Sequence, residues 1–275
     1  MIPLVALAIV TLTTPVSGRV HVPAGTFDMG STAREMEAAL LLCEKELYRA
    51  HCRLTVGPFI RIEGYAHEVM LRDYWIDRTE VTVADYRRCV AARACAPARF
   101  DDGDPEFDRP SFPVTHVRLD DAMAYCAYRS GRLPTEAEWE FAARGAEHRI
   151  FPWGNVYNPR LCNHGAFASN EVDAQDGFAD LAPVGSFPDG ATPLGILDMA
   201  GNVGEWVNGR LELDDAGFGY PPASVFNPKP SLGGGRPVVR GGSYLEGGAW
   251  VRSASRRALV ASMSSSVGFR CAYDP

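Results

Sequence analysis

The sequence predicts a mixed α+β fold in which short helices and strands are joined by many turns. Of the 275 residues, 27 are glycine and 20 are proline, and both types occur throughout the chain, which favours turns over long helices. Helical patterns end near Gly145, and only short strands and turns are indicated after it. We find no internal repeat, low-complexity tract or linker, so residues 19–275 are predicted to form one domain.

Local patterns place the elements of the first half of the chain. Residues 20–30 indicate a strand, a turn and a second strand, and residues 69–77 alternate as one strand. Helices are predicted at residues 33–52, about 83–92, 119–130 and from Thr135 onward. Residues 96–113 contain four prolines and many acids, which predicts a surface loop.

Two threonines mark the starts of predicted helices. Thr82 is expected to be an N-cap with Asp85 three residues on, and Thr135 with Glu138 has the spacing of a capping box. Acids in the first helical turn are favourable because the helix dipole is positive at that end.

The first 18 residues carry no charge and resemble a secretory signal peptide. Their apolar run is shorter than the roughly 20 residues that span a bilayer, and small residues precede a plausible cleavage site at Arg19. The segment lacks the usual basic start, and a buried N-terminal strand is the alternative. We therefore expect an exported protein (periplasmic, envelope-associated or secreted), with no later segment that crosses a membrane.

The distribution of charges and histidines argues against a nucleic-acid partner and against zinc-hydrolase activity. The net charge is −7, with acids and bases interleaved, and without a run of Lys or Arg no nucleic-acid partner is expected. The six histidines are scattered and form no zinc-hydrolase motif. The sequence leaves a protein, a peptide or a small molecule open as the ligand.

Four segments carry the resemblance to a known family. They are Arg132–Glu140 (RLPTEAEWE), Asp198–Trp206 (DMAGNVGEW), Arg240–Glu246 (RGGSYLE) and Gly268–Cys271 (GFRC). Together they resemble the formylglycine-generating enzyme family, also called the sulfatase-modifying factor domains. The resemblance spans nearly the whole of residues 19–275 and implies a C-type-lectin-like fold with little regular secondary structure.

The pattern departs from the family at its catalytic centre. Enzymes of this family oxidise a substrate cysteine at a copper ion held by two cysteines, spaced Cys-x4-Cys just after the Gly-Gly-Ser segment. The matching positions here are Glu246 and Val251. Because Cu(I) selects soft thiolates, the resemblance implies the fold without copper as a cofactor. Gly204 also stands where many members have tryptophan.

The resemblance also implies two structural calcium sites, which suit the oxygen donors present here. In each site, two side chains and two backbone carbonyls would be the ligands. The expected ligands are Asn163, His164, Asp176 and Phe178 for one site, and Asp198, Gly201, Val203 and Glu205 for the other. The alternative is that these acids cap turns and bind no ion.

Seven cysteines in a predicted exported chain suggest disulfides, although the sequence alone does not fix their pairing. The family implies a bridge like Cys126–Cys271, which ties the middle of the domain to its end. The near neighbours Cys43–Cys52 and Cys89–Cys95 are then expected to pair, leaving Cys162 free. The alternative, seven reduced cysteines, requires a cytosolic protein.

Three functional classes follow. The first is a binding or scaffold protein that keeps the fold without the cysteine pair, that is, a pseudoenzyme. The second is a cysteine-independent modifying enzyme or oxidase in which Glu246 is a general base in a pocket lined by Ser243, Tyr244 and Trp250. The third is genuine oxidation of protein cysteine to formylglycine, as in sulfatase activation. Alternatively, Glu246 is a solvated loop acid or pairs with Arg252.

Overall fold

The computed structural model describes residues 18–166, 174–212, 225–228, 235–259 and 264–275. The predicted signal peptide, apart from Gly18, lies outside these residues. Within them, no helix is both long enough and apolar enough to cross a membrane.

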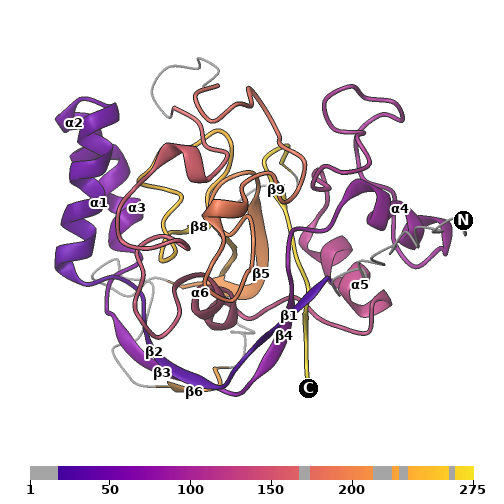
Figure 1. The fold of residues 1–275 in the computed structure, drawn as a ribbon, viewed down its shortest axis with the longest axis horizontal. Helices are drawn as coiled ribbons and strands as arrows, with labels where there is room; N and C mark the ends of the chain where they lie inside the picture. The colour runs from indigo at the N-terminus through magenta and orange to yellow at the C-terminus, as the bar shows by residue number, and fades with distance from the viewer. Residues whose placement is uncertain (1–17, 167–173, 213–224, 229–234, 260–263) are drawn as a thin grey trace, which may run out of the picture.

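The described strands form three small sheets rather than one large one (Figure 1). The strand orders are β1-β4-β10, β2-β3-β6 and β8-β7-β5-β9, with mostly antiparallel pairing. The strands are β1 (Arg19–Val22), β2 (Gly25–Met29), β3 (His67–Leu71), β4 (Tyr74–Asp77), β5 (Gly204–Leu211), β6 (Val225–Phe226), β7 (Arg236–Arg240), β8 (Arg256–Ala258), β9 (Val267–Gly268) and β10 (Ala272–Tyr273). Mixed helix and short sheet confirm the predicted α+β class.

The prediction of one strand over residues 69–77 was wrong. The chain forms two strands there, and they belong to different sheets, because β3 pairs with β2 while β4 pairs with β1. Buried positions alternate up to Leu71 and resume only at Tyr74. The two polar residues between them, Arg72 and Asp73, shift the alternation by one position and turn the chain from one sheet to the next.

Seven segments are helical besides two short 3-10 turns, within the residues described. They are α1 (Ala33–Glu46), α2 (Arg49–His51), a π-helical turn (Cys52–Val56), α3 (Gly57–Arg61), α4 (Val83–Ala91), α5 (Leu119–Tyr128) and α6 (Glu136–Arg144). The 3-10 turns span Pro159–Leu161 and Pro188–Gly190. Thr82 and Thr135 cap α4 and α6 as predicted, and Thr135 forms the capping box with Glu138.

Residues 32–62 form a helical segment on one side of the molecule, comprising α1 to α3, while α4 and α5 lie on the opposite side (Figure 1). We call this segment the helical insertion because it lies between the paired strands β2 and β3. Thr32 and Glu35 form a capping box that starts α1. Arg53 bridges the two arms of the insertion, because its guanidinium binds Glu37 at 2.6 and 2.7 Å and Glu44 at 2.6 Å. Ion pairs between its own residues therefore stabilise the helical insertion.

Helix α6 is buried along its whole length and packs against β2, β5 and β7. Its apolar residues, including Trp139 and Phe141, join the core beneath the sheets. Its carboxylates meet arginines: Glu136 binds Arg256 through two bonds of 2.6 Å, and Glu140 binds Arg240. A buried carboxylate needs such a partner because its desolvation alone costs several kcal/mol.

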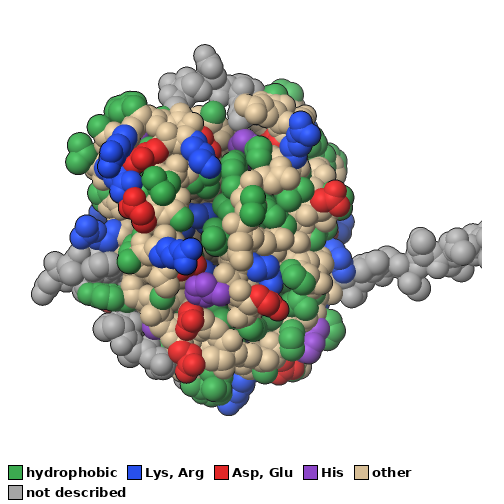
Figure 2. Space-filling view, turned by 60° about the vertical axis from the view of Figure 1, so that its left-hand side comes forward, with side chains coloured by type: hydrophobic (Ala, Val, Ile, Leu, Met, Phe, Trp, Pro, Cys, Tyr) green, Lys and Arg blue, Asp and Glu red, His purple; other side chains and the backbone are tan. Residues whose placement is uncertain are grey.

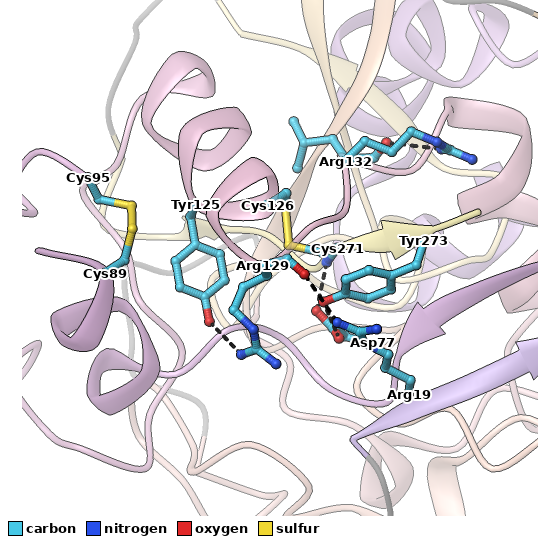
Figure 3. Close-up of a disulfide and its surroundings, with 11 residues drawn as sticks. Arg19, Asp77, Cys89, Cys95, Tyr125, Cys126, Arg129, Arg132, Cys271 and Tyr273 are labelled. Atoms are coloured by element: carbon cyan, nitrogen blue, oxygen red, sulfur yellow. Dashed lines mark hydrogen bonds between the residues drawn. A yellow bond between two sulfur atoms is a disulfide. The ribbon is translucent and has the colours of Figure 1, made fainter. Parts of the chain in front are cut away.

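All seven cysteines lie in the described part of the chain, and six of them form the three predicted bridges: Cys43–Cys52, Cys89–Cys95 and Cys126–Cys271. Cys162 is free and buried. Figure 3 shows the bridge from α5 to the C-terminal segment beside Asp77, whose carboxylate accepts hydrogen bonds from the backbone N–H of Cys271 and the hydroxyl of Tyr273, both at 3.0 Å. The C-terminal segment is thus held by a covalent bond and by polar contacts.

We predict that the long-range bridge contributes more stability than the short one. In the chain-entropy model, removing Cys126–Cys271, whose partners are 145 residues apart, costs about 5 kcal/mol. Removing Cys43–Cys52, with a separation of 9, costs about 2.5 kcal/mol by the same model. Urea unfolding of the double-alanine variants measures both losses, and equal losses would contradict this account.

Candidate functional site

The segment that matches the family's catalytic loop leaves β7 at Arg240 and returns to β8 at Arg256. Gly241 and Gly242 open the loop with φ angles of 92° and 69°, which favour glycine. A Cβ atom on Gly242 would lie 2.8 Å from the carbonyl oxygen of Trp250. The two glycines therefore let the start of the loop fold directly onto Trp250 and Val251.

Glu246 lies inside this loop and is only 4% exposed. Its Oε2 accepts a 3.0 Å hydrogen bond from the hydroxyl of Ser243, and its Oε1 forms an ion pair with Arg257 of β8. Both alternatives that gave Glu246 a purely structural role were wrong. Its side chain is not solvated, and it does not pair with Arg252, which binds Glu63 instead. Burial forces this carboxylate to find an internal partner.

Arg257 is the main residue of this site that the sequence analysis did not predict. Burial lowers its pKa to about 10, so it remains a cation at neutral pH. Its Nη2 lies 3.5 Å from the position of a Cβ atom on Gly204, and that Cβ would also lie 2.6 Å from Val239. The space beside Gly204 therefore holds a guanidinium and a valine, with no room for the tryptophan of many relatives.

Trp250 and Tyr244, the other two residues predicted to line the pocket, differ in their surroundings. The ring of Trp250 is 5.8 Å from that of Phe59 in α3, and its centroid is 6.0 Å from the guanidinium carbon of Arg257. Tyr244 is partly buried, and burial raises the pKa of its hydroxyl despite a hydrogen bond with Ser265. The structure thus brings Ser243, Glu246 and Trp250 around Arg257.

The helical insertion covers this loop from outside. Trp250 belongs to a buried cluster with residues of α1 and α3, including Ala39 and Ile60. Glu46, the last residue of α1, accepts a 3.0 Å hydrogen bond from the backbone N–H of Gly248. The insertion therefore contacts the loop through both apolar packing and a backbone hydrogen bond.

Copper ligands of the family type are missing from this site. Val251 is fully buried and packs in a cluster with Phe151, Ala200 and the free Cys162. Burial strongly raises the pKa of the Cys162 thiol, which opposes the thiolate form that binds metal. Since the other six cysteines are in disulfides, the chain offers one thiol where a pair is needed. The donor set does not fit Cu(I).

The residues expected to form the first calcium shell do converge. Asp176 accepts backbone hydrogen bonds of 2.8 Å from His164 and from Phe178, which joins the two segments. The amide nitrogen of Asn163 donates to Asp180 O and to Asn202 Oδ1, leaving its Oδ1 buried with no hydrogen-bond partner among the described residues. An oxygen in that state suits a hard cation.

The second expected shell is a crowded group of carboxylates. Glu205 is taken by Arg270 at 2.6 and 2.8 Å and by the indole N–H of Trp139 at 2.8 Å. Asp198 accepts a 2.6 Å bond from the backbone N–H of Gly185. The carboxyl group of Glu80 neighbours Asp198, and burial raises the pKa of both acids. Three carboxylates face one guanidinium, an imbalance that a cation would relieve.

Asn202 links the two expected shells. Its backbone N–H donates to Asn163 O at 2.7 Å, and its side-chain nitrogen donates to Glu80 Oε1 at 3.0 Å. Gly201 permits this contact, because a Cβ atom there would lie 1.9 Å from Asn163 O. Glu80 and Asn202 were missed by sequence reasoning. For Glu80, the available signal was an acid three residues after the end of strand β4.

Within the described segments, no three His, Cys, Asp or Glu side chains converge as a metal site. The first expected shell keeps one buried oxygen, Asn163 Oδ1, without a hydrogen-bond partner among the described residues. In the second expected shell, both oxygens of Glu205 accept hydrogen bonds from Arg270 or Trp139. Asn163 and Asp176 with two carbonyls would hold one ion, and Asp198 and Glu205 with two carbonyls the other. The role of such ions would be to brace loops.

The comparisons with known proteins identify the family. Residues 8–275 match the sulfatase-modifying factor enzyme 1-like domain, and the chain belongs to this family. It is 37% identical to the inactive C-alpha-formylglycine-generating enzyme 2 of Bos taurus over 176 residues, covering 60% of this chain and 51% of that protein. It is 39% identical to the formylglycine-generating enzyme of Thermomonospora curvata over 179 residues, covering 61% and 57%.

The chain spans about half the length of the curated relatives it matches. Among solved structures, PvdO from Pseudomonas aeruginosa is similar with a TM-score of 0.68 and 24% identity, covering 94% of both chains. Treponema denticola variable protein 1 gives a TM-score of 0.65 and 19% identity, covering 94% and 95%. At these identities the structures establish the shared fold alone.

We predict strong energetic coupling between Glu246 and Arg257. Arg257→Met leaves a buried carboxylate unpaired and is expected to lower the free energy of unfolding by about 2–4 kcal/mol. Adding Glu246→Gln to that variant should recover part of the loss, which a double-mutant cycle measures by urea unfolding.

The exposed pair Arg88–Asp85 of α4 is the matched control. Its removal by Arg88→Met and Asp85→Asn is expected to show a coupling of about 0.5 kcal/mol or less. A coupling at Glu246–Arg257 no larger than this value would show that the pair contributes nothing beyond a surface contact.

Proposed function

We propose that this protein uses the formylglycine-generating enzyme fold as a binding or scaffold domain and does not oxidise cysteine at copper. The single observation that carries the proposal is the Glu246–Arg257 ion pair, which occupies one of the two positions that match the family's metal-binding cysteines. The other matching position holds the buried hydrocarbon of Val251, and Cys162 is the one thiol outside disulfides.

The burial of Glu246 does not favour a general-base enzyme. A general base must reach the proton that it removes. Here the carboxylate is enclosed by its own loop, and both of its oxygens have partners in Ser243 and Arg257. A substrate proton would therefore have to displace one of these two partners.

Two further features belong to this proposal. Three disulfides support folding in an oxidising compartment, which agrees with an exported protein. The unpartnered Oδ1 of Asn163 and the carboxylate surplus around Asp198 support structural calcium at the two shells. Ions at these positions would stiffen the loops on which a binding surface is displayed.

We predict that the protein leaves a cysteine-containing sulfatase peptide unoxidised when copper is supplied. Mass spectrometry of the peptide after incubation measures formylglycine directly. The Thermomonospora curvata formylglycine-generating enzyme, assayed in parallel, is the positive control. Formylglycine formed at a comparable rate by the present protein would refute the proposed loss of oxidase chemistry.

We predict that a calcium chelator lowers the melting temperature at neutral pH. A site saturated about 100-fold above its Kd contributes about 2.7 kcal/mol, which corresponds to roughly 5–10 °C for a domain of this size. Asp176→Asn should shrink the chelator effect, whereas Asp73→Asn, which changes an acid bound to His21 outside both shells, should not. An unchanged melting temperature in the presence of chelator would contradict calcium binding at both sites.

A further inference from the structure

Three aspartates of the chain stand directly before a glycine, and the structure gives each of them different surroundings. They are Asp102–Gly103, Asp176–Gly177 and Asp189–Gly190, all within the described residues. At such a step the backbone nitrogen of the glycine can attack the aspartate side-chain carbon, because no Cβ atom on the glycine obstructs the approach. The attack closes a five-membered succinimide ring, and water reopens the ring to aspartate or to isoaspartate.

The folded chain restrains the second and third of these steps. Both oxygens of the Asp176 carboxylate accept backbone hydrogen bonds of 2.8 Å, from His164 and from Phe178. Gly190 is buried, and a Cβ atom at its position would lie 1.9 Å from the carbonyl oxygen of Leu161, so the peptide before it has little room to rotate. The glycine nitrogens of both steps donate to backbone carbonyl oxygens. A carbonyl oxygen is too weak a base to take up the proton that an attacking nitrogen must lose.

The first step is open by comparison. The side chain of Asp102 is fully exposed, and Arg87 donates to its Oδ1 at the long distance of 3.3 Å. A Cβ atom on Gly103, whose φ angle is 80°, would have no described atom within 4 Å apart from those of its two chain neighbours. Asp102 and Gly103 form the centre of a turn, which a 3.0 Å hydrogen bond from the N–H of Asp104 to the carbonyl oxygen of Asp101 closes. The carboxyl group and the peptide are therefore both free to rotate.

The charged residues of the segment around this step are all acids. On the face that Figure 2 shows, acidic and basic side chains are interspersed, whereas residues 101–108 contain five acids and no base. Two of these acids bind the segment's own backbone. Asp104 Oδ1 accepts from the N–H groups of Glu106 and Phe107 at 2.8 and 3.0 Å, and Asp108 Oδ2 accepts from the N–H of Gly103 at 2.6 Å. The Gly103 nitrogen thus faces a carboxylate, where the other two glycine nitrogens face a carbonyl.

Asp108 is suited to take up the proton of the Gly103 nitrogen. Its side chain is 5% exposed, and its Oδ1 is buried with no hydrogen-bond partner among the described residues. Arg87 donates to Asp108 Oδ2 at 2.6 Å and to Asp102 Oδ1 at 3.3 Å. One guanidinium therefore positions both the base and the carboxyl group that is attacked, and it can stabilise the oxyanion that forms on that group.

We propose that Asp102–Gly103 is a self-modification site at which the backbone isomerises, with Asp108 as the general base. The Gly103 nitrogen bonds to Cγ of the protonated Asp102 carboxyl group as its own proton passes to Asp108. The Cγ–OH bond then breaks, and the hydroxyl leaves as water with the proton that Asp108 returns. One water molecule reopens the ring, so isoaspartate keeps the mass of the original chain but adds one methylene to the backbone. The reaction does not involve the loop that carries Glu246, so it is independent of the function proposed above.

The test is incubation of the full chain in water labelled with oxygen-18 at mildly acidic pH, followed by peptide mapping by mass spectrometry. Each ring opening places one labelled oxygen in the product, and electron-transfer fragmentation distinguishes isoaspartate from aspartate. In the folded chain, Asp102 is expected to incorporate label at least about 10-fold faster than Asp176 or Asp189. In urea with the disulfides reduced, where the local sequence alone acts, the three rates should be similar.

Asp108→Asn keeps a hydrogen-bond acceptor but removes the base, and it should slow labelling at Asp102 at least about 10-fold. Glu106→Gln, which changes an exposed acid of the same segment, is the matched control and should leave the rate at Asp102 unchanged. The proposal is overturned if Asp102 reacts no faster than the other two aspartates in the folded chain, if its advantage persists in urea, or if the two variants react alike. If Asp108→Asn fails to fold, the comparison of folded with unfolded wild-type chain decides the matter. None of these outcomes bears on the copper assay, so the isomerisation and the loss of oxidase chemistry are tested separately.

Discussion

The charged side chains of helix α6 impose the constraint on which the rest of the structure depends. The helix is buried from end to end, yet four of its nine residues are charged: Glu136, Glu138, Glu140 and Arg144. Each carboxylate must meet a guanidinium, because an unpaired buried charge costs a large part of a domain's margin of stability. Arg240 ends β7 and Arg256 begins β8, so pairing with α6 fixes both ends of the loop between these strands. The loop that carries Glu246 is thus positioned by the ion pairs that its two end residues form with α6.

The same principle explains how the chain can keep the fold without the metal pair. The framework around the loop is made of α6, its arginine partners and the Cys126–Cys271 bridge, and none of these involves positions 246 or 251. A buried carboxylate at position 246 is tolerable because Arg257 of β8 pairs with it, and the small Gly204 leaves room for that guanidinium. The ion pair is therefore a local feature of the loop and does not involve the framework beneath it.

Many local features of the fold were predictable because they depend on interactions between residues that are close in the sequence. The capping residues Thr82 and Thr135 and the disulfide near neighbours follow from spacing, and the Cys126–Cys271 bridge followed from family resemblance. Features that depend on packing were not predictable. One expected partner of Glu246 was Arg252, six residues along the chain, but Glu63, which follows the helical insertion, binds that arginine. Glu80 could not be assigned to a shell because Asn202, 122 residues away, brings it there.

The helical insertion packs directly against the loop that carries Glu246. Trp250 is shared between them, since its ring contacts Phe59 on one side and lies near Arg257 on the other, and it belongs to the buried cluster with residues of α1 and α3. Glu46 adds a polar contact from α1 to the backbone of Gly248. A shift of α1 or α3 would therefore move Trp250, and with it the packing around the Glu246–Arg257 pair. Because protein interiors are closely packed, the positions of α1, α3 and the loop are mutually dependent through this one indole.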